Sequence, residues 1–148
     1  MEVNKLEKRF LNIVIQRIQT VWLFLAVVLN TLVFFTPLYT EVVSDPGDWL
    51  MPLLMASLGF SALGSVYGIF QYNKRPYQIK VVTYSMLFQI IGFGASVGVV
   101  LNVIDFNSIE FNQFYGPALI LFAWILQFMA IKGIQKDEKL VKSMDRIR

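Results

Sequence analysis

The spacing of the charged residues constrains this chain more than any other feature. Residues 18–40, 49–73, 81–104 and 111–131 contain no Asp, Glu, Lys or Arg, and each of these four windows is predominantly apolar. A helix rises about 1.5 Å per residue, so roughly 20 residues cross about 30 Å of hydrocarbon. Because backbone groups inside lipid must pair within their own segment, we expect each window to form a membrane-spanning helix.

Proline, glycine and aromatic residues set the expected ends of these helices. The sequence predicts transmembrane helices over about 19–38, 50–72, 79–101 and 117–133, with Pro37 near the end of the first. Pro52 and Pro117 fall in the first turns of the second and fourth helices, where a missing N–H leaves no hydrogen bond unmade. The short links favour antiparallel neighbours. The predicted fold is an all-α, up-down-up-down four-helix bundle that forms one membrane domain, residues 1–148.

The basic residues predict an orientation. All 13 Lys and Arg lie before residue 18, between residues 74 and 80, or after residue 131. The charged residues of the first and third links are all acidic, namely Glu41, Asp45, Asp48, Asp105 and Glu110. Because short cytoplasmic segments of membrane proteins are enriched in Lys and Arg, we expect both termini in the cytoplasm.

The side-chain inventory argues against catalysis. The chain has no histidine and no cysteine, which removes histidine acid–base chemistry, thiolate nucleophiles, disulfides and Cys/His metal sites. The acids Asp45, Asp48, Asp105 and Glu110 are scattered over short links and match no cation-ligand spacing. We expect no enzyme activity, no cofactor and no bound metal.

Three amides fall near the middle of predicted spans: Asn30, Gln89 and Gln127. A buried amide costs free energy unless it is hydrogen-bonded. One interpretation is that the three bond across the bundle, and the other is that they line a path for a small solute. No ionisable residue lies within any predicted span, which argues against a proton-coupled transporter.

Small residues concentrate on the second and third predicted helices, and small faces let helix backbones approach closely. The candidate seam residues are Gly64, Gly68, Gly94 and Gly98, and Ser57, Ser61 and Ser65 repeat at the same four-residue spacing. The short link between the two helices favours packing of the second helix on the third. A homodimer seam is the alternative.

The C-terminal segment, residues 134–148, mixes basic and apolar residues at helical spacing and predicts an amphipathic extension of the fourth helix. This extension either docks on a partner or anchors on anionic lipid headgroups. The candidate contacts to a partner or to lipid are Lys136, Lys139, Leu140, Lys142, Met144 and Arg146. The segment has no interleaved aromatic residues, so we expect no nucleic-acid binding.

Two segments resemble the ends of proteins in a known family. They are Ile15-Gln16-Arg17-Ile18-Gln19-Thr20 and Lys136-Asp137-Glu138-Lys139-Leu140-Val141, the latter followed by Asp145-Arg146. The family comprises small four-helix bacterial membrane proteins, is catalogued as a domain of unknown function, and is typical of the Bacteroidota. The likeness covers residues 14–148, and the 13 preceding residues depart from the pattern, which a GTG start codon at Val14 would explain. The resemblance implies an inner-membrane location and supplies no activity.

These features favour a small accessory or structural subunit of an inner-membrane assembly. The alternative is a binder or carrier of a small lipophilic or uncharged solute. The expected partners are the anionic headgroups of the bilayer and another membrane protein. Assembly into a homo-oligomer is a further alternative.

Overall fold

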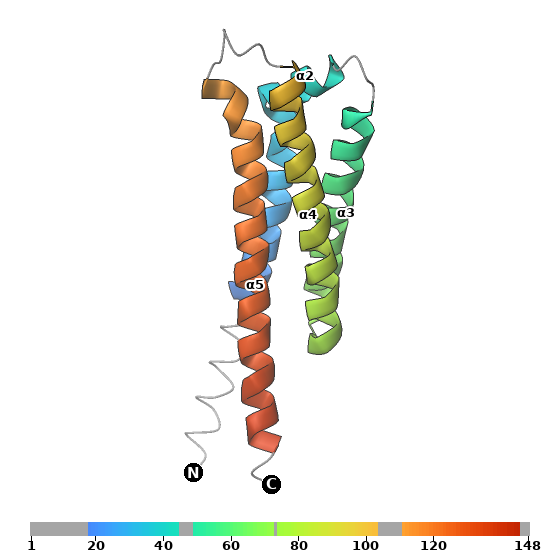
Figure 1. Cartoon of the computed structure of the whole chain (residues 1–148). Coiled ribbons are helices and arrows are strands. Elements are labelled where there is room, and N and C mark those ends of the chain that lie inside the picture. Colours follow the sequence, from blue (N-terminus) through green and yellow to red (C-terminus); the bar gives the residue numbers. More distant parts are fainter. Residues whose placement is uncertain (1–17, 45–48, 73, 104–110, 146–148) are drawn as a thin grey trace.

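The computed structural model in Figure 1 describes residues 18–44, 49–72, 74–103 and 111–145. Every regular element in these ranges is a helix, which confirms the predicted all-α class. Four helical segments are long and apolar enough to cross a membrane, namely Ile18–Phe35, Leu50–Phe70, Arg75–Leu101 and Phe111–Lys139. They lie side by side and alternate in direction (Figure 1). The chain is therefore a multi-pass membrane protein.

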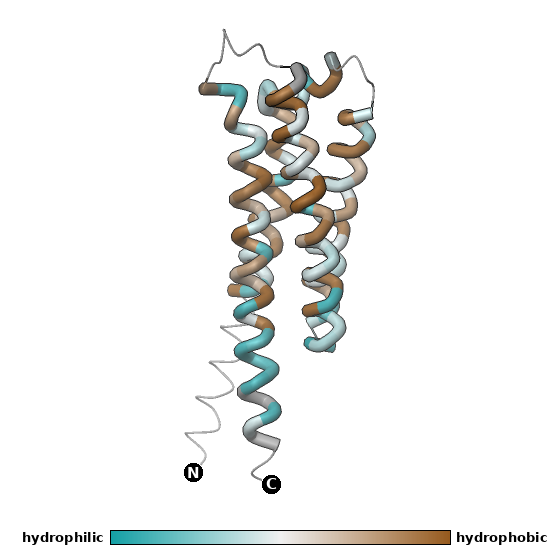
Figure 2. The backbone as a smooth tube through the Cα atoms, viewed as in Figure 1, coloured by the Kyte–Doolittle hydropathy of each residue, from teal (hydrophilic) through white to brown (hydrophobic). Residues whose placement is uncertain are grey.

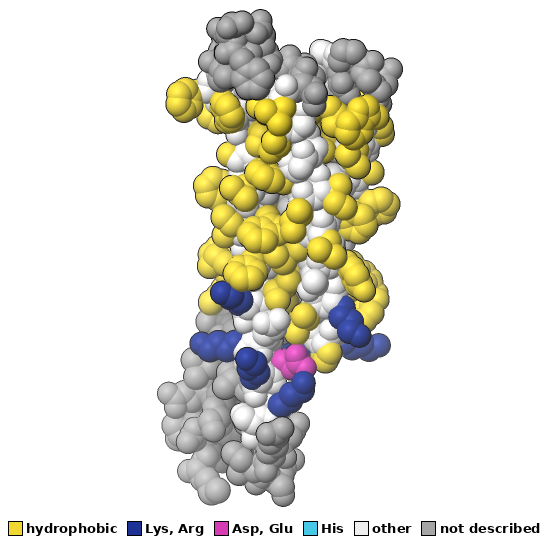
Figure 3. Space-filling model, in the orientation of Figure 1, with side chains coloured by type: hydrophobic (Ala, Val, Ile, Leu, Met, Phe, Trp, Pro, Cys, Tyr) yellow, Lys and Arg dark blue, Asp and Glu magenta, His cyan; other side chains and the backbone are white. Residues whose placement is uncertain are grey.

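Hydropathy changes along the long axis of the molecule. Figure 2 shows hydrophobic residues along most of each helix and hydrophilic residues along the lower part of α5 (Tyr115–Asp145). On the face shown in Figure 3, the Lys and Arg side chains gather below a broad band of hydrophobic side chains. We call this lower end the basic end; its described basic residues are Lys74, Arg75, Lys80, Lys132, Lys136, Lys139 and Lys142.

The first span ends in a break that the sequence analysis did not predict. Its last residues form a 3-10 turn, η1 (Val33–Phe35), and Thr36 is extended, with φ −93° and ψ 159°. A new helix, α2 (Pro37–Val43), then begins at the proline. The predicted helix over 19–38 is interrupted because the residue before a proline disfavours the α conformation. Part of the predicted first link is therefore helical.

Two long helices follow, α3 (Leu50–Phe70) and α4 (Arg75–Val103). Pro52 lies in the first turn of α3, as predicted. Helix α4 begins at Arg75, four residues before the predicted start, because Pro76 also falls in a first turn, where its missing N–H costs no hydrogen bond. The turn between the helices is tight, and the Lys74 N–H donates to the Gln71 carbonyl at 3.0 Å.

The last span joins a short 3-10 turn, η2 (Phe111–Phe114), to the longest helix, α5. Helix α5 includes the predicted span 117–133 and runs on without a break to Asp145, so the predicted basic extension continues the same helix. Residues 146–148, including Arg146, lie outside the described residues.

Helices α3 and α4 pack closely through small residues. A Cβ on Gly68 would lie 2.8 Å from Val82 Cγ2, and one on Gly64 would lie 3.0 Å from Ser85 Cβ. A Cβ on Gly98 would lie 3.5 Å from a methyl group of Leu50. Gly94 does not take part in the predicted seam, because no atom of another helix in the described part of the chain lies within 4 Å of its Cβ position.

The buried core consists of two apolar clusters with polar side chains between them. The cluster farther from the basic end contains Val33, Leu38, Val42, Leu50, Leu54, Leu58, Ala95, Val99 and Ile120. The cluster nearer the basic end contains Leu23, Val82, Met86, Ala130 and Ile131. On α4 the two clusters leave Gln89 between them, and on the first span they leave Asn30. This gap between the clusters holds the candidate functional site.

Candidate functional site

The gap between the apolar clusters is filled by a hydrogen-bonded network of amides and hydroxyls. Asn30 and Gln89 form its upper part and are 2% and 0% exposed. The Asn30 Nδ2 donates to Gln89 Oε1 at 3.0 Å, and the Gln89 Nε2 donates to Asn30 Oδ1 at 2.7 Å. These reciprocal bonds join the first span to α4.

Gln89 extends the network to the other two spans. Its Nε2 also donates to the backbone carbonyl of Ile120 on α5, at 3.1 Å. The Ser61 hydroxyl on α3 donates to Gln89 Oε1. One side chain at the centre of α4 therefore contacts a polar atom from each of the three other spans.

Gln127 forms the lower part of the network and reaches Gln89 only through a hydroxyl. Its Nε2 lies 2.9 Å from the Oγ atoms of Ser61 and Ser65, and 3.0 Å from Ser85 Oγ. Ser65 and Ser85 are hydrogen-bonded to each other at 3.0 Å, and the Ser85 hydroxyl donates to the Ser61 carbonyl. Ser61 therefore bridges the Gln127 amide and the Asn30–Gln89 pair.

The network holds helices together and offers no acid or base. Its side chains are amides and hydroxyls, which do not titrate in the physiological range. All six are buried: Asn30, Ser61, Ser65, Ser85, Gln89 and Gln127. One polar atom, Gln127 Oε1, is buried without a hydrogen-bond partner among the described residues. The arrangement fixes the register of four spans.

Spacing along the sequence predicts the three amides but not the hydroxyls that connect them. It indicates Ser61 and Ser65 only as small residues and does not indicate Ser85. The sequence does contain a signal for these hydroxyls, because Ser85 and Gln89 are four residues apart on one helix face and Ser61 and Ser65 repeat at the same spacing.

A second polar cluster lies at the basic end. Asp137 on α5 is 2% exposed, and its Oδ2 accepts a hydrogen bond from Gln19 Nε2 at 2.9 Å. The Arg75 Nη1 donates to the backbone carbonyl of Asp137 at 3.3 Å. The other carboxylate oxygen, Oδ1, is buried and has no hydrogen-bond partner in the described ranges. This cluster ties the first span and the start of α4 to α5.

By charge pattern alone, Asp137 belongs to the basic tail. The residues of α5 that face the core recur at intervals of three and four, which is the helical repeat of a buried face. They include Ile120, Ala123, Gln127, Ala130, Ile134 and Asp137. Continuing the stripe by one turn would have identified the buried carboxylate.

A carboxylate also lies at the opposite end, on α2. Burial raises the pKa of the Glu41 carboxyl above its ordinary value of 4.5, and a side-chain hydrogen bond with Gln113 of η2 lowers this pKa in part. One oxygen, Glu41 Oε2, is buried and has no hydrogen-bond partner within the described residues. The pair links α2 to the start of the last span.

An apolar pocket of about 190 Å³ lies between α4 and α5, beside the network. Its lining residues are Gln89, Ile90, Phe93, Leu121 and Trp124. The Trp124 Nε1 is buried and donates to no described residue. Of the three predicted amides, the pocket lining includes Gln89 alone.

The basic part of α5 is exposed. Lys136, Lys139 and Lys142 are exposed, and Lys142 Nζ lies 2.7 Å from Glu138 Oε1. The backbone at Leu140 and Met144 is helical, while their side chains lie outside what the structure describes.

Across residues 18–44, 49–72, 74–103 and 111–145, no three Asp, Glu, His or Cys side chains gather to hold a metal ion. The acids Asp45, Asp48, Asp105 and Glu110 fall outside these ranges.

Comparison with known proteins places the chain by sequence. Residues 15–147 match a family described as a domain of unknown function, DUF4293. No curated protein and no solved structure matches the chain. The match covers nearly the whole chain and all four spans, in agreement with the resemblance to an uncharacterised family.

Proposed function

We propose that this chain, which belongs to the DUF4293 family, is a small accessory subunit that docks on a partner at the inner membrane of a bacterium. In this proposal the basic end faces the cytoplasm. The support is that all 13 Lys and Arg fall in the segments at that end of the four-span topology. Such a bias of basic residues is the usual determinant of orientation in the inner membrane.

The main support for the docking role is that α5 extends beyond the ends of the neighbouring helices. Arg75, the first residue of α4, contacts the backbone of Asp137, so residues 138–145 of α5 continue beyond the start of α4. Figure 1 shows α5 extending below the lower ends of the neighbouring helices. Eight residues of helix at 1.5 Å each project about 12 Å. A projecting helix with exposed Lys139 and Lys142 presents a surface to a cytoplasmic partner.

The buried network supports a structural rather than a transporting role. Its amides and hydroxyls bond one another across all four spans, and it contains no ionisable group of the kind that ion and proton pathways use. A helix core held in one register is a suitable scaffold for presenting α5. We propose no enzymatic activity, because the chain lacks histidine and cysteine.

Truncation after Lys139 tests the docking role. This position leaves Asp137 and its contact to Gln19 intact, so the four spans should insert and pack as in the full chain. The tagged full chain and the truncated chain are purified from native membranes in mild detergent, and co-purifying proteins are quantified. We expect the truncated chain to lose its partner.

The matched control is Lys74→Gln with Lys80→Gln, which removes basic charge from the same end without shortening α5. This variant should retain the partner. Equal recovery of the same partner by the truncated and full chains would contradict docking through α5 and assign the contact to the membrane spans.

A second candidate function, binding of an uncharged lipophile, is favoured by the pocket beside Trp124. The Trp124 Nε1, which has no hydrogen-bond partner among the described residues, can donate to a carbonyl oxygen of a molecule in this apolar space. A chain with Trp22→Phe and Trp49→Phe retains Trp124 as the single tryptophan. Titration with 2-undecanone should then change its fluorescence saturably, and Leu121→Trp with Trp124→Phe would serve as the blocked control. A linear, unsaturable change would exclude this binding site.

A further inference from the structure

A second hollow, of about 380 Å³, lies on the outward side of α3 and α4, away from the core. Its floor is formed where Gly64 lets the two helices approach, since a Cβ there would lie 3.0 Å from Ser85 Cβ. Val81 and Tyr84 line one side, and Tyr84 is 64% exposed. Because these helices cross a membrane, this groove opens toward lipid.

Pairs of aromatic rings mark the two ends of the groove. Phe60 and Phe88 contact each other at one end, with ring centroids 5.2 Å apart. Tyr67 and Tyr77 pack edge to face at the other end, with ring centroids 6.3 Å apart and an interplanar angle of 83°. The Phe pair lies midway along α3 and α4, and the Tyr pair lies near the basic end.

The length of the groove matches one leaflet of a bilayer. Tyr77 and Phe88 are separated by eleven residues of α4. At 1.5 Å per residue the groove runs about 16 Å along the helix axis. The hydrocarbon core of a bilayer is about 30 Å thick, so each leaflet contributes roughly 15 Å. The groove therefore begins at the basic end and stops near the bilayer midplane.

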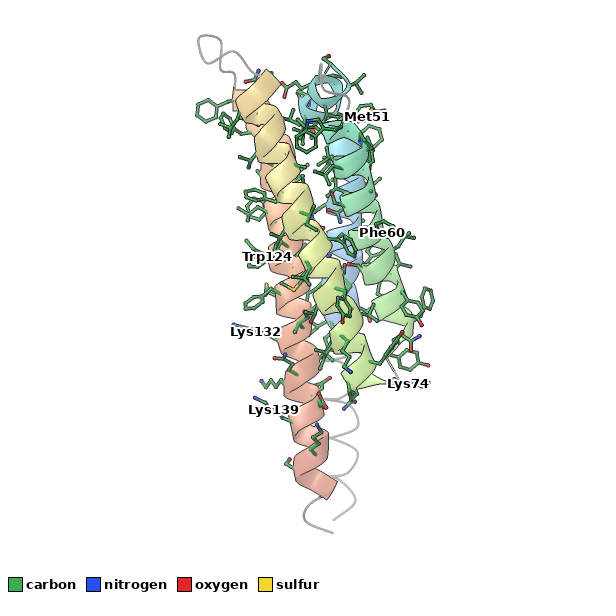
Figure 4. All side chains as sticks on the ribbon, turned by 45° about the vertical axis from the view of Figure 1, so that its right-hand side comes forward. Met51, Phe60, Lys74, Trp124, Lys132 and Lys139 are labelled. Carbon is green, nitrogen blue, oxygen red and sulfur yellow. The ribbon has the colours of Figure 1, made fainter. Side chains whose placement is uncertain are left out.

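Basic side chains border the open end of the groove. Lys74 immediately precedes α4 and lies three residues before Tyr77. Lys80 lies within α4, three residues after Tyr77 and four before Tyr84, so it shares the side of the helix that lines the groove. Both lysines are exposed. Figure 4 shows Phe60 midway along α3 and Lys74 at the lower end of α3 and α4. The groove thus has an apolar interior and a cationic rim.

We infer that this groove binds an anionic phospholipid of the leaflet at the basic end. One acyl chain lies along Val81 and Tyr84 and ends at the Phe60–Phe88 pair, and the headgroup phosphate lies between Lys74 and Lys80. The Tyr67 and Tyr77 rings sit at the depth of the headgroup, where tyrosine is enriched in membrane proteins. This site is independent of docking through α5.

The geometry favours a lipid over a helix as the occupant. A helix from a partner or from a second copy would cross both leaflets, whereas the lining of this groove spans one and ends at the Phe60–Phe88 pair. A lysine pair at the open end of the groove complements a phosphate, which a membrane-spanning helix does not carry at that depth.

Photo-crosslinking of the purified full chain tests the site directly. The probe is a phosphatidylglycerol with a diazirine at the middle of one acyl chain, compared with a phosphatidylcholine that carries the same chain. Adducts are mapped by mass spectrometry of the peptides. We expect adducts to concentrate in the segments that line the groove, residues 60–67 and 77–88, and to be more abundant with the anionic lipid.

Two variants separate the headgroup contact from the acyl-chain contact. Lys74→Gln with Lys80→Gln should reduce the excess of phosphatidylglycerol adducts by about tenfold or more, because each basic side chain near anionic headgroups contributes roughly fivefold in binding. Val81→Phe fills the groove and should reduce groove adducts with both lipids. Val81 is partly exposed and outside the buried clusters, so this change should leave the core intact.

The matched control is Lys132→Gln with Lys136→Gln, which removes the same charge from α5 and should leave groove adducts unchanged. Equal labelling by the two lipids, or adducts spread evenly onto the lipid-facing residues of α5, would overturn the site. A change from dimer to monomer on Val81→Phe, without loss of lipid adducts, would assign the groove to a second copy of the chain and also overturn it.

Discussion

Gln89 joins α4 to each of the three other spans, since it bonds Asn30 twice, the Ile120 carbonyl and the Ser61 hydroxyl. Asn30 has described side-chain bonds to Gln89 alone. Removing Gln89 therefore leaves more polar groups unpaired than removing Asn30 does. The two residues differ in what they hold together, although they are chemically alike.

This difference predicts the result of a double-mutant cycle on the two amides. We expect Asn30→Leu to lower the free energy of unfolding by about 1 kcal/mol and Gln89→Leu by about 2 kcal/mol, taking roughly 0.6 kcal/mol per hydrogen bond in a membrane protein. The double variant should cost less than the sum, because both single changes remove the same two bonds. Unfolding by denaturant in mixed micelles measures all three. Strictly additive values would show that the two amides are not coupled.

Glu41 provides a pH-dependent test at the other end of the molecule. Its pKa is raised in the folded chain, so the folded state binds this proton more tightly than the unfolded state does. Its contribution to stability is therefore present at low pH and is lost as the pH rises above the ordinary carboxyl range. We expect Glu41→Gln to unfold at a higher temperature than the natural chain at pH 7, with the difference shrinking toward pH 4. A difference that stays constant between pH 4 and pH 8 would contradict the burial of this carboxyl.

At the scale of elements, the sequence predicted the four spans with approximate ends and left their relative register open. The charge-free windows predict length and apolar character, and these are what a bilayer demands. To predict the break at Thr36, one must weigh the conformational effect of Pro37 against the apolar run around it. The extension of α5 beyond residue 133 was predicted, but its contact with the core required recognising Asp137 as a core-facing residue within a charged tail.

In the candidate site, too, the sequence predicts the residues on single helices but not how the helices bring them together. Single helices place Asn30, Gln89 and Gln127 at similar depths, which one sequence can predict from spacing alone. Whether Ser61 bridges the two parts of the network depends on the offset of α3 along α4. Close approach at Gly64 and Gly68 sets that offset, and the pairing of helices is a tertiary property that spacing along one chain does not specify.

A pair of glycine substitutions tests the packing of α3 on α4. Gly68→Ala places a Cβ 2.8 Å from Val82, a stiff and fully buried side chain, so we expect it to destabilise the chain by about 1–3 kcal/mol. Gly94→Ala meets open space and should be neutral or stabilise by up to about 1 kcal/mol, because alanine favours the helix. Thermal unfolding in detergent measures both. Equal effects at the two positions would contradict the observed helix faces.

For the molecule as a whole, polar and apolar layers alternate along the membrane normal. The Glu41–Gln113 contact lies at one end, the amide–hydroxyl network lies between two apolar clusters, and Asp137 with Gln19 lies at the basic end. The middle layer joins all four spans, the Asp137 layer joins three of them, and the Glu41–Gln113 contact joins α2 to the start of the last span. The projecting end of α5 is then held at a defined position relative to the four spans, as the proposed docking role requires.

In the proposed topology, four spans carry the basic end, with the projecting part of α5, into the cytoplasm. The chain has no cysteine, so single cysteines report accessibility without further changes. Ser44→Cys lies after α2, and Tyr72→Cys and Ser143→Cys lie at the basic end. In intact spheroplasts, a membrane-impermeant maleimide should label the first variant and should label the other two only after permeabilisation. Labelling at Tyr72→Cys or Ser143→Cys in intact spheroplasts, with protection at Ser44→Cys, would contradict the account.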